Sequence, residues 1–140
     1  MEDCSHSVFE FTITIQPEHI DQLDHVNNLV YVKWVQDAAV NHWNKCARKE
    51  LHDSIIFVIA RHEIDYIYSA KLGDTVRVRT RIGAARKNLF ERFTEITRES
   101  DGKLLLKALS LWCPLDAKTH RLIRPPENLI NEWSVGNKNN

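Results

Sequence analysis

Alternation of hydrophobic and polar residues dominates the chain on both sides of one central segment. From Val8 to Ile15, phenylalanine and isoleucine occupy every second position, and glutamate and threonine lie between most of them. A repeat of two is typical of a strand with one buried face. Pro17 ends this strand. Much later in the chain, Gly83 favours a turn after the strand predicted over 74–82. Similar alternation or largely apolar composition predicts further strands over 55–68, 74–82, 89–97 and 103–115.

The central segment, from Asn28 to Leu51, repeats with a helical period instead. Asn27 is a suitable N-cap for a helix that begins there. Two overlapping series make a wide apolar stripe, which is typical of a helix wrapped by other structure on most of its surface. A short second helix is predicted from Glu127, after two prolines. The main series at helical spacing consists of Tyr31, Val35, Ala38, His42 and Cys46.

The order of these elements predicts an α+β fold in one domain. One strand, one long helix, four strands and a short helix favour an antiparallel five-stranded sheet wrapped around the long helix. A single helix cannot cover both faces and both edges of such a sheet, so we expect a homodimer or a homotetramer. The domain is expected to span 1–134, followed by a disordered tail over 135–140.

Charge and composition exclude several classes of protein. The chain of 140 residues has 19 basic and 19 acidic residues and a formal net charge of zero. A nucleic-acid-binding protein usually has a basic excess, so no nucleic-acid partner is expected. No apolar run approaches the length of a membrane span, and the acidic N-terminus is unlike a signal peptide. The three cysteines are widely spaced, which favours free thiols and a cytoplasmic location.

The most informative segment for chemistry is the polar stretch from Asp21 to Tyr31. It contains two carboxylates, a histidine and two asparagines, and it leads into the predicted long helix. The positive end of a helix dipole stabilises a nearby carboxylate. The free backbone N–H groups there could instead polarise a substrate carbonyl. Although His19 and His25 lie near Asp21 and Asp24, their spacing fits no metal-ligand pattern, so no metal is expected.

The pattern Asp-x-x-x-His-Val-Asn-Asn-x-x-Tyr, which begins at Asp21, resembles the signature of the 4-hydroxybenzoyl-CoA thioesterase-like hot-dog family. The stretches over 61–66 and 71–76 are similar to a second characteristic segment of that family. This resemblance implies a hot-dog fold and an enzyme that hydrolyses acyl-CoA thioesters to a free acid and coenzyme A. It implies no bound cofactor, because coenzyme A arrives as part of the substrate.

The resemblance also implies roles for individual residues. Asp21 would either attack the thioester carbonyl as a nucleophile or activate a water as a general base. Backbone N–H groups around Asn28 would stabilise the oxyanion, while His25 and Asn27 would orient the loop or the water. Two positions differ from relatives: Asp24 replaces a common glycine, and Leu23 replaces an asparagine of the plant acyl-ACP thioesterases. Asp37 is an alternative carboxylate, because other hot-dog lineages use an acidic residue within the helix.

Substrate binding is expected at two places. Large side chains on the helix, among them Tyr31, would shorten an acyl pocket and favour short or aromatic acyl groups. The predicted turn formed by Arg86, Lys87 and Asn88 corresponds to the place where relatives often hold the nucleotide end of coenzyme A. The three arginines over 77–81 share one strand face, which is either solvated or in contact with coenzyme A phosphates.

Each site residue has a structural alternative, and the function has two. The alternative for Asp21 and Asn27 is a purely structural role as caps of the helix. The alternative for His25 is a buried hydrogen bond that holds the loop. The same fold could serve an acyl-ACP thioesterase, for which a basic surface at the pocket mouth would be suited to an acidic carrier protein. It could also serve a non-catalytic acyl-CoA binding module, which would bind esters without turnover.

Overall fold

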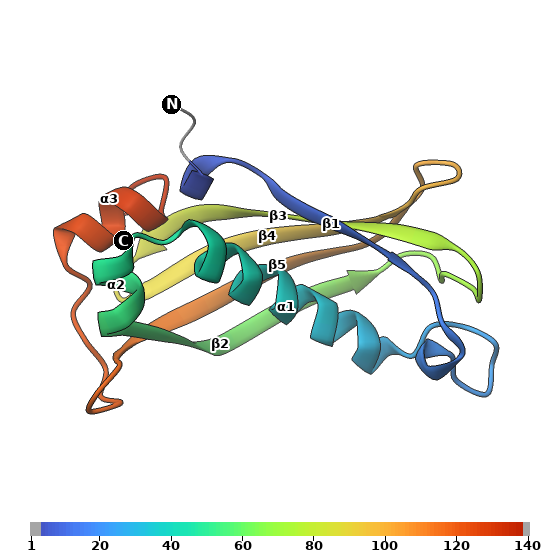
Figure 1. The fold of residues 1–140 in the computed structure, drawn as a ribbon, viewed down its shortest axis with the longest axis horizontal. Helices are drawn as coiled ribbons and strands as arrows, with labels where there is room; N and C mark the ends of the chain where they lie inside the picture. Colours follow the sequence, from blue (N-terminus) through green and yellow to red (C-terminus); the bar gives the residue numbers. More distant parts are fainter. Residues whose placement is uncertain (1–3, 139–140) are drawn as a thin grey trace.

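The computed structural model describes residues 4–138, which form one sheet, one long helix and several short helices (Figure 1). The helices are α1 (Asn28–Cys46), α2 (Lys49–Ser54) and α3 (Glu127–Trp133), with 3-10 turns η1 (Cys4–His6) and η2 (Pro17–His19). The strands are β1 (Phe9–Thr14), β2 (Ile55–Tyr66), β3 (Thr75–Arg86), β4 (Leu89–Arg98) and β5 (Leu104–Asp116).

The five strands form one sheet in the order β1-β3-β4-β5-β2, and every neighbouring pair is antiparallel. Figure 1 shows α1 lying across one face of this sheet and running antiparallel to β2. The main core joins this face to the helix, and it includes Val35 from α1, Val78 from β3 and Leu106 from β5. The predicted α+β class and hot-dog arrangement are therefore confirmed.

The long helix is shorter than its apolar pattern predicts, because the chain bends after Cys46. Ala47 and Arg48 have extended backbones, with ψ angles of 138° and 142°. The Arg48 guanidinium donates two hydrogen bonds of 2.9 Å to Glu132, at the end of α3, which fixes the bend. The separate helix α2 then leads directly into β2 at Ile55.

Gly83, which favours a turn in the sequence, lies instead within β3 at a break in its pairing with β4. A Cβ atom there would lie 2.7 Å from Phe93 Cε2 and 2.8 Å from Glu91 Cβ. The position therefore requires glycine because of close contact, not because of a turn. This close packing lets β3 continue to Arg86, four residues beyond its predicted end.

Residues 135–138 lie beside the end of β3 and pair with it through backbone hydrogen bonds. Beyond Thr80, β3 has no β1 partner, so its backbone groups are open to pairing. The Val135 N–H donates to the Gly83 carbonyl at 2.9 Å, and the Ala85 N–H donates to the Gly136 carbonyl at 2.9 Å. The last part of the described chain thus satisfies backbone groups that would otherwise lack partners. Residues 139–140 lie outside the described part.

The cysteines also differ from the prediction of free thiols. Cys4 and Cys46 form a disulfide that joins η1 to the end of α1, while Cys113 is free and buried. The sequence separation of 42 hid this pairing, which the packing of η1 against α1 creates. No helix in the described part of the chain is long and apolar enough to span a membrane.

Candidate active site

The loop before α1 is closed by its own backbone hydrogen bonds. The Asp21 N–H donates to the His25 carbonyl at 2.9 Å, and the Asp24 N–H donates to the Asp21 carbonyl at 3.1 Å. Asp24 is exposed and has a left-handed φ of 61°. The Val26 N–H donates to the Ala70 carbonyl, which attaches the loop to the segment between β2 and β3. The loop therefore holds a fixed shape at the entrance to α1.

The half-buried carboxylate of Asp21 organises this loop through one of its oxygens. Its Oδ1 accepts hydrogen bonds from the Leu23 N–H at 2.9 Å and from the His25 N–H at 3.4 Å. Within residues 4–138, Oδ2 accepts no hydrogen bond, so it is available to a substrate or a water. The geometry supports a structural role for one oxygen and leaves a chemical role open to the other.

Asn27 is the N-cap of α1, as its position predicts. Its side-chain Oδ1 accepts a hydrogen bond of 2.9 Å from the Leu29 N–H. Asn28 follows as the first helical residue and is exposed. The Leu29 and Val30 N–H groups already donate to the side chain and the carbonyl of Asn27, so the Asn28 N–H is the group in this turn that can donate to an oxyanion. Asn27 is thus shown to be the cap, and the role of Asn28 as a donor stays a prediction.

Tyr31 lies in the core. Its ring is 2% exposed, and its hydroxyl accepts a hydrogen bond of 2.9 Å from the Ala70 N–H. Burial raises the pKa of this hydroxyl. Because Ala70 also accepts the hydrogen bond from Val26, Tyr31 fixes the same segment that holds the loop. Within one protomer, Tyr31 therefore positions the loop and does not line an acyl cavity.

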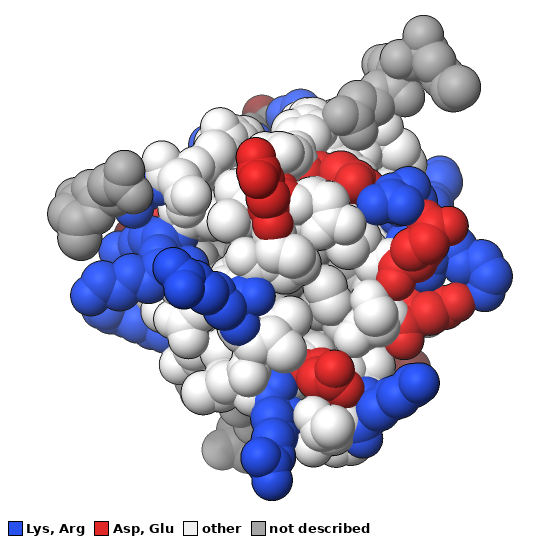
Figure 2. Space-filling view, turned by 90° about the vertical axis from the view of Figure 1, so that its left-hand side faces the viewer, with Lys and Arg blue, Asp and Glu red and all other residues white. Residues whose placement is uncertain are grey.

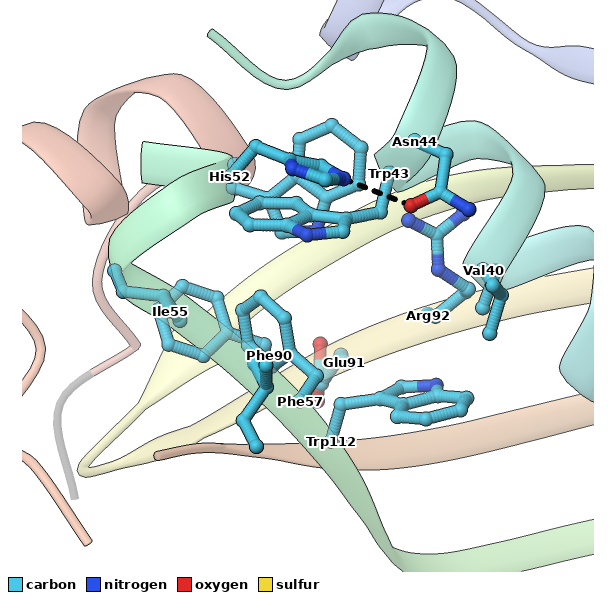
Figure 3. Close-up of a pocket in the computed structure, with 13 residues that line it drawn as sticks. Val40, Trp43, Asn44, His52, Ile55, Phe57, Phe90, Glu91, Arg92 and Trp112 are labelled. Carbon is cyan, nitrogen blue, oxygen red and sulfur yellow. Dashed lines mark hydrogen bonds between the residues drawn. The ribbon is translucent and has the colours of Figure 1, made fainter. Parts of the chain in front are cut away.

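An apolar cavity of about 250 Å³ lies at the other end of α1 (Figure 3). The helix rises about 1.5 Å per residue, so Trp43 in the cavity wall lies roughly 22 Å along the axis from Asn28. The cavity is thus remote from Asp21 within one protomer. Its main lining residues are Trp43, Phe57, Phe90, Arg92, Trp112 and Trp133.

The turn formed by Arg86, Lys87 and Asn88 joins β3 to β4 at the end of the sheet where α2 and α3 lie (Figure 1). Phe90, two residues after the turn, lines the cavity. Lys87 has a left-handed φ of 56°, and Arg86 Nε lies 3.3 Å from Glu91 Oε2. Figure 2, which views this end, shows Lys and Arg together with Asp and Glu side chains around a largely uncharged centre, with the largest group of Lys and Arg at the left. The twelve residues of β3 separate this turn from the Asp21 end by about 40 Å. One protomer therefore does not bring the two predicted parts of the site together.

Arg92 and His42 form a buried polar group beside the cavity, and neither is among the site residues predicted from the sequence. Arg92 is 3% exposed, and its Nη1 donates to His42 Nδ1 at 3.0 Å and to Thr80 Oγ1 at 3.1 Å. His42 Nε2 in turn donates to the Cys4 carbonyl at 3.1 Å. Burial and the Arg92 cation lower the pKa of His42 to about 4, and burial lowers the pKa of Arg92 to about 9.

The alternating pattern of β4 could have identified Arg92, because this arginine interrupts the apolar face of the strand. Arg92 shares the strand face of Phe90 and Ile96, which are buried against the helix. An arginine on the apolar face of an alternating strand is unusual, because arginine is almost never fully buried unless paired. The sequence gives no comparable signal for a metal site, and no group of three or more His, Cys, Asp or Glu side chains within 4–138 could hold a metal ion.

Comparisons with known proteins agree with this fold. Residues 15–133 match the family model described as the thioesterase-like superfamily. Over 78 residues, the chain is 32% identical to the chloroplastic palmitoyl-acyl carrier protein thioesterase of Cuphea hookeriana. This match covers 56% of this chain and 19% of that protein, so the chain spans about a fifth of the length of this curated relative.

Two solved structures have the same fold. The 12:0-ACP thioesterase from Umbellularia californica has a TM-score of 0.77 and 23% identity, covering 89% of this chain and 49% of that one. A thioesterase from Thermus thermophilus, solved with coenzyme A and Zn, has a TM-score of 0.75 and 24% identity, covering 89% of this chain and 95% of that one. Since the family model spans most of the sequence, the chain belongs to the thioesterase-like superfamily.

Proposed function

We propose that this chain hydrolyses acyl-CoA thioesters to a free acid and coenzyme A, with Asp21 as the catalytic carboxylate. The observation that carries this proposal is the fixed loop before α1, in which Asp21 keeps one oxygen available. Membership of the thioesterase-like superfamily supports the reaction type. The relative solved with coenzyme A supports a CoA ester as the substrate.

Two mechanisms are compatible with the loop. In the first, Asp21 attacks the thioester carbonyl, coenzyme A leaves as a thiolate, and water hydrolyses the resulting mixed anhydride. In the second, Asp21 accepts a proton from a water, which attacks the carbonyl directly. In both, the backbone N–H of Asn28 stabilises the oxyanion, and His25 and Asn27 hold the loop in position.

We also propose that the active unit is a homodimer, alone or as half of a tetramer. β2 is an edge strand with only β5 as a neighbour, and Val58 and Tyr66 on it are 42% and 44% exposed. Long exposed edges invite pairing with another strand. A two-fold axis that pairs two copies of β2 would set the two α1 helices antiparallel. The Asp21 loop of one copy would then lie at the end where the second copy has its cavity and its 86–88 turn.

Sedimentation equilibrium tests this assembly. The chain has a mass of 16.4 kDa, so a dimer should sediment at twice that mass and a tetramer at four times. We expect no substantial monomer at micromolar concentrations, because the exposed apolar edge of β2 favours association. A monomer that retains full thioesterase activity would contradict the proposal that two copies share one site.

Thiol release from CoA esters tests the reaction. We expect turnover of at least one ester among acetyl-, hexanoyl-, palmitoyl- and benzoyl-CoA, followed with a chromogenic thiol reagent. The cavity is smaller than the roughly 300–1,000 Å³ that is typical for drug-sized ligands, which favours the shorter or aromatic acyl groups. Protein thiols must be blanked, because Cys113 is free. High activity on palmitoyl-CoA alone would contradict the size argument.

An acyl-ACP thioesterase is the second candidate. The curated relative from Cuphea hookeriana acts, by its name, on a palmitoyl-acyl carrier protein. The group of lysines and arginines at the left of Figure 2 would suit an acidic carrier, while Asp and Glu side chains occupy other parts of the same face. Presenting the same acyl group on coenzyme A and on a carrier protein separates the two candidates. Tight binding of CoA esters without thiol release would instead indicate a binding module.

A further inference from the structure

The cavity beside α1 has apolar walls and a polar side. Aromatic rings from four elements surround it, contributed by Trp43, Phe57, Phe90 and Trp112 (Figure 3). Asn44 and His52 also line it and are joined by a hydrogen bond of 2.9 Å. A volume of about 250 Å³ admits one small group of a substrate and not a whole acyl-CoA molecule.

The cation of Arg92 faces this cavity without a countercharge. Among the described residues, no carboxylate lies within 4.0 Å of its guanidinium, and its hydrogen bonds to His42 and Thr80 both leave from Nη1. Arginine has five N–H donors, so those on Nε and Nη2 have no hydrogen-bond acceptor within residues 4–138. The guanidinium also lies over the Trp133 ring, 5.4 Å from its centroid, which partly stabilises the cation. A buried charge is nevertheless costly, and such charges are normally paired with a countercharge.

Trp112 adds a second donor next to Arg92. Its indole Nε1 is buried and has no hydrogen-bond partner within the described part of the chain. In the register of β4 and β5, Trp112 pairs with Phe90 while Arg92 pairs with Ser110. Arg92 and Trp112 are therefore diagonal neighbours on the same sheet face, within reach of a single bound group.

Most of the other polar groups near the cavity already have partners, and the exception is the Nδ2 amide of Asn44, which lines the exposed side of the cavity. Glu91, which precedes Arg92, is also among the residues that line the cavity, and its carboxylate accepts from the Ala84 N–H at 3.2 Å. The same carboxylate lies 3.5 Å from Lys138 Nζ. His42 uses both ring nitrogens, one toward Arg92 and one toward the Cys4 carbonyl. Arg92 and Trp112 therefore supply the buried donors left for a ligand in the described part of the chain.

We propose that this cavity binds a carboxylate at the far end of the acyl group. The substrate class would then be CoA thioesters of dicarboxylic acids, with the apolar walls around the carbon chain and Arg92 and Trp112 Nε1 on the terminal carboxylate. Guanidinium–carboxylate pairs are among the stronger hydrogen-bonded contacts in proteins. This inference rests on the proposed thioesterase function, and in the dimer the cavity would serve the Asp21 loop of the other copy.

The test compares esters that differ only at their far end. We expect hexanedioyl-CoA to have a kcat/KM at least tenfold above that of hexanoyl-CoA. In Arg92→Met, which keeps an unbranched apolar side chain but removes the donors, we expect this ratio to fall below one. Arg121→Met removes an exposed arginine in the turn after β5 and should keep the wild-type ratio. A wild-type preference for hexanoyl-CoA would overturn the proposal, whatever the variant does.

Binding separates this inference from the reaction. Non-hydrolysable thioethers of coenzyme A that carry a hexyl or a 5-carboxypentyl group can be titrated by calorimetry into the wild-type protein. Tighter binding of the carboxypentyl ligand would support the cavity assignment even if no ester is hydrolysed. Equal or weaker binding would overturn it even if hydrolysis is fast. The wild-type comparison also decides the matter if Arg92→Met does not fold.

Discussion

Replacing Asp21 with asparagine is expected to lower kcat/KM for the best CoA ester at least a hundredfold without unfolding the protein. The amide can neither attack a carbonyl nor accept a proton, which removes both mechanisms for this residue. Its oxygen can still accept from the Leu23 and His25 N–H groups, so the loop should keep its shape. A hundredfold loss corresponds to about 2.7 kcal/mol of transition-state stabilisation.

The matched control is Asp24→Asn, three residues along the same loop. Asp24 is exposed, and asparagine tolerates its left-handed φ of 61°. We expect this variant to keep kcat/KM within a few-fold of the wild type, measured by thiol release. If Asp21→Asn is as active as Asp24→Asn, Asp21 only closes the loop. The next candidate would then be Asp37, which is paired with Lys33 at 2.7 Å.

Acidification from pH 7 to pH 4 is expected to destabilise the fold through His42 by about 3 kcal/mol. The folded pKa is about 4, below the usual 6.5, because burial and Arg92 disfavour the protonated ring. Between these two values the unfolded chain binds a proton that the folded chain does not. The stability is therefore fully present above pH 6.5, is lost as the pH falls to about 4, and levels off below that.

Urea unfolding at pH 7 and pH 4, with the disulfide intact, measures this effect. His42→Gln removes the titrating group. From pH 7 to pH 4, the free energy of unfolding should therefore fall less in this variant than in the wild type, by about 3 kcal/mol. His120→Asn removes an exposed histidine and should keep the wild-type pH dependence. An equal pH dependence in His42→Gln and the wild type would show that His42 does not titrate between these values.

The strands and the capping residue of α1 follow from local patterns, so the sequence predicts them well. Alternation over 74–82 places Val76 and Val78 on the buried face, and β3 begins at Thr75, one residue from the prediction. Asn27 was identifiable as a cap because short polar side chains bond the free N–H groups of a first turn. These features depend on neighbours within a few positions.

The remaining features depend on contacts between distant segments, which a local pattern does not contain. The bend after Cys46 is fixed by Arg48 and Glu132, which are 84 positions apart. The disulfide from Cys4 and the pairing of Val135 with Gly83 also join remote parts of the chain. The cavity also depends on long-range contacts, because its walls come from several elements. The alternation in β4 therefore marks Arg92 as unusual but does not show which residues surround it.

The Asp21 loop and the Arg92 cavity lie at opposite ends of α1, and this separation has a genetic consequence if two copies share each site. One allele that lacks the carboxylate and another that lacks the cation would each be defective alone. A mixed dimer of the two products would contain one site with both defects and one site with neither. Two inactivating alleles of this kind should therefore complement each other in one cell, whereas two alleles that alter the same end should not.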